Sequence, residues 1–258
     1  MCLVAIAWNT QPRLPLVLIA NRDELHARPA AAAGFDPEHA DLYGGRDLLA
    51  GGGWLMASRR GRLAAVTNVR AGIGQAAMPR SRGDLVRGFA AGSTTAARFA
   101  DDLSGIAAGY GRFNLLLWDG DDLRFATNHP AFAAAAVAPG LHAMSNGAFD
   151  ADWPKATHAT RALAAWLDAH DRLPAEAAAL EPLFGALADT ERAPDALLPD
   201  TGVGMELERT LSPAFILDPR YGTRCSSIVM VADDGAMVFA ERRFDARGER
   251  TGTSCVRL

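Results

Sequence analysis

The chain has few of the features that mark secreted, metal-binding or membrane proteins. Its three cysteines, Cys2, Cys225 and Cys255, lack CxxC spacing, so neither a disulfide framework nor a zinc site is predicted. No apolar run approaches the roughly twenty residues that span a bilayer. The N-terminus also lacks the basic region and long apolar run of a secretory signal. We therefore expect a cytoplasmic protein with no transmembrane segment and no metal.

Excess positive charge is also missing. The formal net charge is −4 and the basic residues form no long run, which argues against a nucleic-acid partner. The triplet Gly51-Gly52-Gly53 is not followed by Gly-Lys-Ser/Thr, so it is not a phosphate loop. The hydrophobic content of 49% and charged content of 22% are typical of a globular protein. We expect one domain over residues 1–258, with a small-molecule partner.

The most informative feature that is present is Cys2, directly after Met1. Removal of Met1 would leave a free α-amine beside the thiol, and that amine or a nearby carboxylate can take the thiol proton. Residues 2–8 and 14–20 are apolar runs joined by a polar turn, which predicts an antiparallel hairpin. With the turn near Gln11, Cys2 lies opposite about Asn21. The hairpin therefore returns residues 21–24 to the thiol.

Strand and turn signals continue along the chain, without the regular alternation of strands and helices that predicts a parallel sheet. Short turns between consecutive strands require antiparallel pairing. We therefore predict an α+β protein with two stacked antiparallel sheets flanked by helices, and a loop over 190–210. The further strands are expected over 54–57, 63–69, 112–118, 123–128, 141–145, 226–231 and 237–243. The helices are expected over 81–91, from 93 or 94 to 106, 154–170 and 174–187.

Short motifs at strand ends and turns follow one another in a single order along nearly the whole chain. They are Met1-Cys2, Asn21-Arg22-Asp23-Glu24, Arg28-Pro29, Gly53-Trp54-Leu55, Thr67-Asn68-Val69-Arg70, Ser81-Arg82-Gly83, Phe113-Asn114-Leu115-Leu116, Ser145-Asn146, Trp153-Pro154-Lys155, Leu198-Pro199-Asp200-Thr201-Gly202, Leu211-Ser212-Pro213 and Tyr221-Gly222-Thr223-Arg224. With these motifs the chain resembles the NRDE family, also called the transport and Golgi organisation protein 2 family. The resemblance implies an αββα sandwich of the N-terminal-nucleophile (Ntn) hydrolase type.

The resemblance extends to the cysteine Ntn amidases that cleave penicillin V and conjugated bile salts. Those enzymes use an N-terminal Cys, an Arg and an Asp on the next strand, two Asn and a late Arg. The corresponding candidate catalytic residues are Cys2, Arg22, Asp23, Asn68, Asn146 and Arg224. In that reading the thiolate attacks a carbonyl, the amine or the Asp carries the proton, the two Asn bind the oxyanion, and an Arg holds the thiolate or a substrate carboxylate.

One departure from the amidase pattern concerns Arg22 and Asp23, which are adjacent here but not in those enzymes. Adjacent strand residues point to opposite faces of a sheet. Either the strand has ended before them, or a bulge re-aims one of them. A structural ion pair between the two, and turn-capping roles for Asn68 and Asn146, remain alternatives.

The resemblance implies two functions. Family members are associated with intracellular haem transfer, and acyl-coenzyme A handling has been proposed; both ligands carry acidic groups that arginines can meet. We favour the binding and trafficking of such an anionic hydrophobic molecule, with haem only as a bound ligand and no cofactor required. The alternative is a cysteine Ntn amidohydrolase that acts on a small linear amide. The candidate ligand-binding residues are Asn21, Glu24, His26, Arg28, Trp54 and Arg70, although His26 and Trp54 also suit packing roles.

Overall fold

The computed structural model describes residues 2–74 and 78–258, and the chain divides into two compact units. The first unit contains Met1–Ala27, Arg70–Ile73 and Pro139–Leu258, and the second contains Arg28–Val69 and Gly74–Ala138. Met1, whose removal would free the α-amine of Cys2, lies outside the described part of the chain. Among the helices of the described residues, none has both the length and the apolar composition to cross a bilayer.

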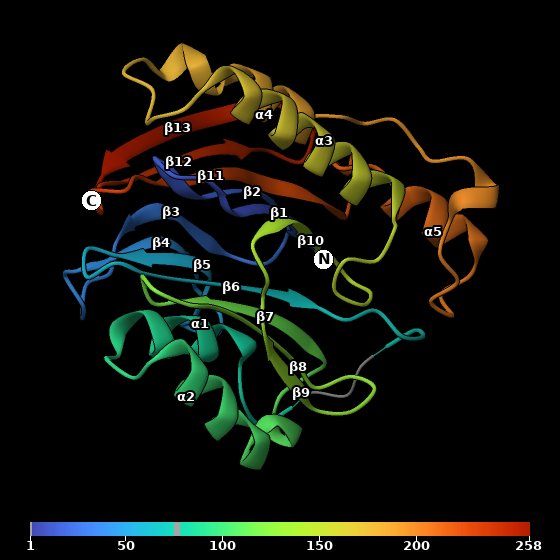
Figure 1. Ribbon diagram of the computed structural model, residues 1–258. Helices are drawn as coiled ribbons and strands as arrows, with labels where there is room; N and C mark the ends of the chain where they lie inside the picture. Colours follow the sequence, from blue (N-terminus) through green and yellow to red (C-terminus); the bar gives the residue numbers. More distant parts are fainter. Residues whose placement is uncertain (1, 75–77) are drawn as a thin grey trace. The chain divides into compact units, whose positions relative to one another are not determined.

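The first unit is built on an antiparallel six-stranded sheet (Figure 1). Its strand order is β10-β1-β2-β11-β12-β13, so the first hairpin lies inside the sheet and is paired on both sides. The strands are β1 (Cys2–Gln11), β2 (Leu14–Leu25), β10 (Gly140–Met144), β11 (Tyr221–Val231), β12 (Met237–Phe244) and β13 (Arg250–Arg257).

Two helices, α3 (Pro154–Ala169) and α4 (Glu181–Leu187), cover one face of this sheet, which we call the helix face (Figure 1). Every second residue of β1 and β2 points to that face, as the alternation of a strand requires. Leu3 and Ile19 therefore pack in one apolar cluster with Leu163 and Leu187 of the helices. A third helix, α5 (Met205–Leu211), and the 3-10 helices Ala177–Leu180 and Asp195–Leu197 belong to the connection that leads to β11.

The second unit contains an antiparallel seven-stranded sheet whose strand order follows the sequence. Helices α1 (Arg82–Ala91) and α2 (Ala96–Asp102) lie over one face of it, and Phe89 of α1 is fully buried there (Figure 1). The strands are β3 (Ala30–Phe35), β4 (Leu42–Asp47), β5 (Gly53–Ser58), β6 (Arg62–Asn68), β7 (Phe113–Trp118), β8 (Leu123–Thr127) and β9 (Ala133–Ala136), and two 3-10 helices cover Leu103–Gly105 and Ala107–Gly109.

Several sequence predictions about these elements are confirmed. The first hairpin is present as β1 and β2. Helix α1 begins after Ser81, whose hydroxyl accepts a hydrogen bond from the N–H of Gly83, as an N-cap should. Helix α3 begins at Pro154, where the missing N–H of proline costs nothing because the first helical N–H has no partner inside the helix.

Other elements differ from the predictions. The predicted loop over 190–210 contains most of α5, which spans Met205–Leu211. Helix α2 is capped by Thr95 instead of residue 93 or 94 and ends at Asp102, and the helix expected over 174–187 is helical only from Ala177, first as a 3-10 turn. Strands β3 and β9 are alanine-rich and β13 is polar and largely exposed, so their sequences carry weak strand propensity. Their strand form depends on pairing with neighbours.

Candidate functional site

The first hairpin places Cys2 directly opposite Arg22. The sequence predicted Asn21 at that position, so the register differs from the prediction by one residue. The cause is a turn that lies later than predicted, since Gln11 pairs with Leu14, which by itself would place Cys2 opposite Asp23. An irregularity between Trp8 and Gln11, where Asn9 adopts a left-handed backbone with φ of 48°, moves the pairing back by one residue to Arg22. Directly opposed residues share a face, and a shift of one residue reverses the face that each side chain occupies. Cys2 and Arg22 therefore share the face opposite the helix face.

Asp23 points to the helix face instead. Neither of the two alternatives considered for β2 is found: the strand continues to Leu25, and the irregularity in this pairing lies in the partner strand β11, between Thr223 and Cys225. Because β2 is not interrupted, Arg22 and Asp23 keep their opposite orientations. On its own face, Asp23 is paired with Thr223, whose hydroxyl donates to the carboxylate Oδ1 at 2.7 Å. The hydroxyl of Tyr221 donates to the backbone oxygen of Asp23, also at 2.7 Å.

Asn146 lies at the same end of the sheet as Cys2. Strand β10 pairs Met144 with Val4, so the chain that continues for two more residues brings Asn146 alongside Cys2. Ser145 confirms this placement, because its hydroxyl donates to the backbone oxygen of Cys2 at 3.0 Å. The first unit therefore brings Cys2, Arg22 and Asn146 together, and all three are at least nine-tenths buried.

The thiol of Cys2 sits in surroundings that favour its neutral form. Burial raises the pKa of Cys2, and the negative charge of Asp23 raises it further, whereas the guanidinium of Arg22 lowers it. Burial also raises the pKa of Asp23, and the nearby ammonium of Lys155 opposes that change. Cys225, opposite Arg22 on the other neighbouring strand, has a pKa raised well above the ordinary range by burial. The thiolate needed for nucleophilic attack is therefore disfavoured near neutral pH.

Asn21, which the sequence predicted to bind ligand, is fully buried. Its amide nitrogen donates to the backbone oxygens of Leu187 at 2.7 Å and Ala214 at 2.8 Å, and its amide oxygen accepts from the hydroxyl of Ser226 at 2.6 Å. These bonds tie β2 to the end of α4, to the segment after α5 and to β11.

Four further candidate residues of the first unit are held by protein groups. The ring of His26 is within hydrogen-bond distance, 3.0 Å, of the backbone oxygen of Asp218. Arg224, at the bulge, donates to the backbone oxygens of residues 25 and 26. Arg70 forms a buried ion pair with Glu208, and its Nε donates to Thr201 Oγ1 at 2.8 Å. Glu24 lies 3.8 Å from Arg22 and accepts from the N–H of the next residue. Such contacts indicate structural roles for these side chains.

The other three candidates belong to the second unit. Asn68 ends strand β6 opposite Phe113. Arg28 forms an ion pair with Asp47 at 2.6 Å. Trp54 is a buried residue of β5, as the packing alternative for this side chain predicted.

Lys155 is a residue that the sequence reasoning missed. It is the only lysine in the chain, among 26 lysines and arginines, yet its side chain is 4% exposed. The composition was the available signal. All the remaining lysine or arginine positions of the chain hold arginine, and the single lysine stands where α3 begins. Lysine carries a compact ammonium whose pKa responds strongly to burial, which makes it chemically different from arginine.

The surroundings of Lys155 explain its lowered pKa. Its Nζ donates to the backbone oxygen of Leu211 at 3.0 Å and lies 5.9 Å from the ring centre of Trp153. Burial lowers the pKa of Lys155 from 10.5 to about 8, while the negative charge of Asp23 opposes this change. The lysine is therefore mostly charged at neutral pH and loses its proton at a moderately alkaline pH.

Metal ligation receives no support from the described side chains. Over residues 2–74 and 78–258, no group of three or more His, Cys, Asp and Glu side chains is placed to hold a metal ion.

Comparisons with known proteins agree with the motifs. The profile of a family described as "Transport and Golgi organisation 2" matches residues 1–246. A Bos taurus protein named "Transport and Golgi organization protein 2 homolog" is 30% identical, with 94% of this chain and 92% of that protein covered. The Homo sapiens protein of the same name is 28% identical with the same coverage.

Solved structures of very different sequence share the fold. The conjugated bile acid hydrolase of Clostridium perfringens has a TM-score of 0.55 at 6% identity, covering 100% of this chain and 92% of its own. The N-acylethanolamine-hydrolyzing acid amidase orthologue of Caenorhabditis elegans has a TM-score of 0.52 at 10% identity, covering 88% and 92%. This likeness confirms the predicted fold class, that of the Ntn hydrolases, with two antiparallel sheets and flanking helices.

The buried hydrogen bonds of Asn21 generate a first prediction. Asn21→Ala should lower the free energy of unfolding by roughly 2–4 kcal/mol, because buried partners lose their bonds. Chemical denaturation followed by circular dichroism measures this. The matched control is Ser227→Ala on β11, since the Ser227 hydroxyl is buried without a hydrogen-bond partner among the described residues. Equal losses of stability in the two variants would contradict the structural role of Asn21.

The lowered pKa of Lys155 generates a second prediction. The unfolded chain keeps the lysine proton up to about pH 10.5 and the folded chain only up to about pH 8. Because the unfolded state binds more protons between these values, Lys155 makes the free energy of unfolding rise with pH there. The wild type should therefore gain stability relative to Lys155→Met across this window, by a total on the order of 3 kcal/mol. Urea unfolding of both proteins at several pH values measures the difference. A pH-independent difference would contradict the buried charge.

Proposed function

Since the chain belongs to the transport and Golgi organisation 2 family, we propose that it binds and transfers an anionic hydrophobic small molecule, such as haem or an acyl-coenzyme A. The binding site is placed around Cys2, Arg22 and Asn146. The family match over residues 1–246 supports one functional domain over 1–258, and we propose that it acts in the cytoplasm.

The observation that carries this proposal is the pairing of a buried thiol with a buried arginine. Arg22 is 6% exposed and shares a sheet face with Cys2. Its closest recorded carboxylate, that of Glu24, is 3.8 Å away, which is longer than a charge-assisted hydrogen bond. A carboxylate or phosphate of a ligand can therefore form a shorter, stronger pair with this guanidinium.

The neutral thiol fits ligand binding better than nucleophilic catalysis. A protonated, buried cysteine behaves as a small apolar side chain with a polarisable sulfur. If haem is the ligand, its iron can bind the sulfur of Cys2 in place of the thiol proton, because a thiol that coordinates a metal ion is deprotonated outright. For an acyl-coenzyme A, the same thiol would only line the apolar part of the site.

Haem titration followed in the Soret band tests this function. Cys2→Ala should shift the Soret maximum or abolish binding, because it removes the sulfur, and Arg22→Gln should weaken binding about tenfold through the lost charge. His26→Ala is the matched control and should bind as the wild type does, because its ring already contacts Asp218.

The same variants separate the two ligand classes. If the acyl ligand is the true one, Arg22→Gln should weaken the binding of palmitoyl-coenzyme A and Cys2→Ala should change it little. Calorimetry measures this binding. The proposal fails if the folded wild type binds neither ligand, or if all three variants bind both ligands like the wild type.

The second candidate function is a cysteine Ntn amidohydrolase, which is favoured by the position of Cys2 on the first strand beside Arg22 and Asn146. An oxyanion that develops during amide cleavage would need the Asn146 amide as a donor. Against it, Asp23 faces the helices and is bonded by Thr223. This enzyme would also require the removal of Met1, which mass spectrometry of the purified protein detects.

Thiol alkylation at several pH values distinguishes the two functions. In a protein with Cys225→Ala and Cys255→Ala, only Cys2 reacts with iodoacetamide. Because burial raises the pKa of Cys2 above its ordinary value of 9.0, the rate should still be rising at that pH. A rate that levels off near neutral pH would show an activated thiolate and favour the hydrolase. The denatured protein serves as the control for the ordinary thiol.

A further inference from the structure

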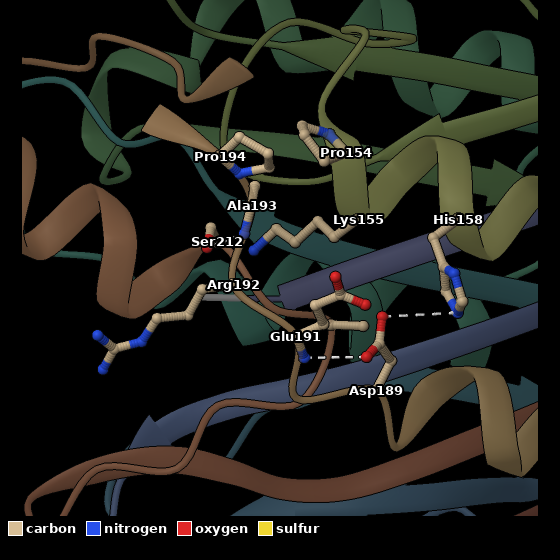
Figure 2. Close-up of a pocket in the computed structure, with 10 residues that line it drawn as sticks. Pro154, Lys155, His158, Asp189, Glu191, Arg192, Ala193, Pro194 and Ser212 are labelled. Carbon is tan, nitrogen blue, oxygen red and sulfur yellow. Dashed lines mark hydrogen bonds and ion pairs between the residues drawn. The ribbon is translucent and has the colours of Figure 1, made fainter. Parts of the chain in front are cut away.

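A cavity of about 170 Å³ lies at the start of α3 in the first unit (Figure 2). Lys155 and His158 of α3 line it, together with Asp189 and Arg192 from the segment after α4 and Ser212 after α5. A cavity needs only roughly 10–15 Å³ to hold one water molecule. This cavity therefore has room for an organic molecule of several heavy atoms.

Among the described residues that line this cavity, Lys155 is the one that carries a buried charge. Figure 2 shows its ammonium group on the side where Ala193 and Ser212 line the cavity. The ammonium has three N–H donors, and the hydrogen bond recorded for it among the described residues goes to the backbone oxygen of Leu211. Two donors are left for another acceptor. A buried cation is costly unless an anion or acceptors compensate it.

We propose that this cavity binds a small monocarboxylic acid, whose carboxylate accepts hydrogen bonds from the Nζ of Lys155. This inference goes beyond the proposed function, because it concerns the helix side of the first unit, whereas Cys2 and Arg22 point to the other face of the sheet. A carboxylate accepts a charge-assisted hydrogen bond from an ammonium group, which is stronger than a bond between neutral groups.

The other charged side chains of the cavity define the charge of the ligand. Asp189 lies 3.8 Å from the Nε2 of His158, and its Oδ1 accepts the N–H of Glu191 at 2.9 Å. Both carboxylates, those of Asp189 and Glu191, are on the cavity wall. Like charges repel in such a site, so a ligand with two negative charges is disfavoured relative to a monocarboxylate. Arg192 is exposed, and Figure 2 shows its guanidinium pointing away from the ammonium of Lys155.

The presence of a single lysine gives a direct test. Protein labelled with ¹³C at the lysine Cε gives one lysine side-chain signal by NMR, and its pH titration reports the pKa of Lys155. Propionate should shift this signal in a saturable way and raise the pKa, because the carboxylate stabilises the ammonium. Propan-1-amine, of similar size and opposite charge, should do neither. Equal effects of the two compounds would overturn the proposal.

Variants measured by calorimetry locate the site. Lys155→Met should weaken propionate binding at least tenfold, whereas Arg209→Met should leave it unchanged, because Arg209 is an exposed cation of α5 paired with Asp195. Should Lys155→Met not fold, as judged by circular dichroism, Lys155→Gln replaces it.

Two results would contradict the proposal. Unchanged propionate binding in the folded Lys155 variant would place the ligand elsewhere, and tighter binding of malonate than of propionate would exclude a monocarboxylate site. Haem binding to the same Lys155 variant tests the proposed site around Cys2, whereas propionate binding tests the site at Lys155. Failure of one proposal therefore does not decide the other.

Discussion

The pairing of β2 with β1 on one side and β11 on the other is the constraint on which the candidate site depends. Directly opposed residues share a face, so Cys2, Arg22 and Cys225 form one row across three strands. The same pairing places Asp23 opposite Thr223 on the helix face, where the Thr223 hydroxyl donates to its carboxylate. Four consecutive polar residues of the second strand are thereby divided between two different environments. Their chemistry follows from this division more than from their adjacency in the chain.

Buried charge is the second theme of the first unit. The ion pair of Arg70 and Glu208 is compensated, since Thr201 donates to the same carboxylate. Lys155 is compensated less well, with one hydrogen bond and the more distant charge of Asp23. A buried charge without a close partner lowers stability. Its presence in a chain that otherwise uses arginine for its cations is best explained by a ligand or a proton that Lys155 binds.

The shared fold does not decide the chemistry. The bile acid hydrolase and the acid amidase have the same fold class at 6% and 10% identity, and unrelated activities can occupy one scaffold. The chemistry of this chain depends on local features. Its thiol is buried and mostly neutral, and the carboxylate beside it in sequence faces the helices. The pairing of an anionic ligand with Arg22 requires no change in either feature, whereas catalysis, like coordination of haem iron by Cys2, requires a thiolate.

The sequence by itself determined the family, the fold class and the first hairpin, because strand runs, turn residues and ordered motifs are local signals. It also identified Cys2, Arg22 and Asn146, although not the one-residue shift that pairs Cys2 with Arg22. Only the tertiary structure showed that Asn21 is a buried bridge between β2, α4 and β11, and that Lys155 lines a cavity. The hydrogen-bond partners of Asn21 lie 166 to 205 positions away and that of Lys155 lies 56 positions away, which no local pattern encodes.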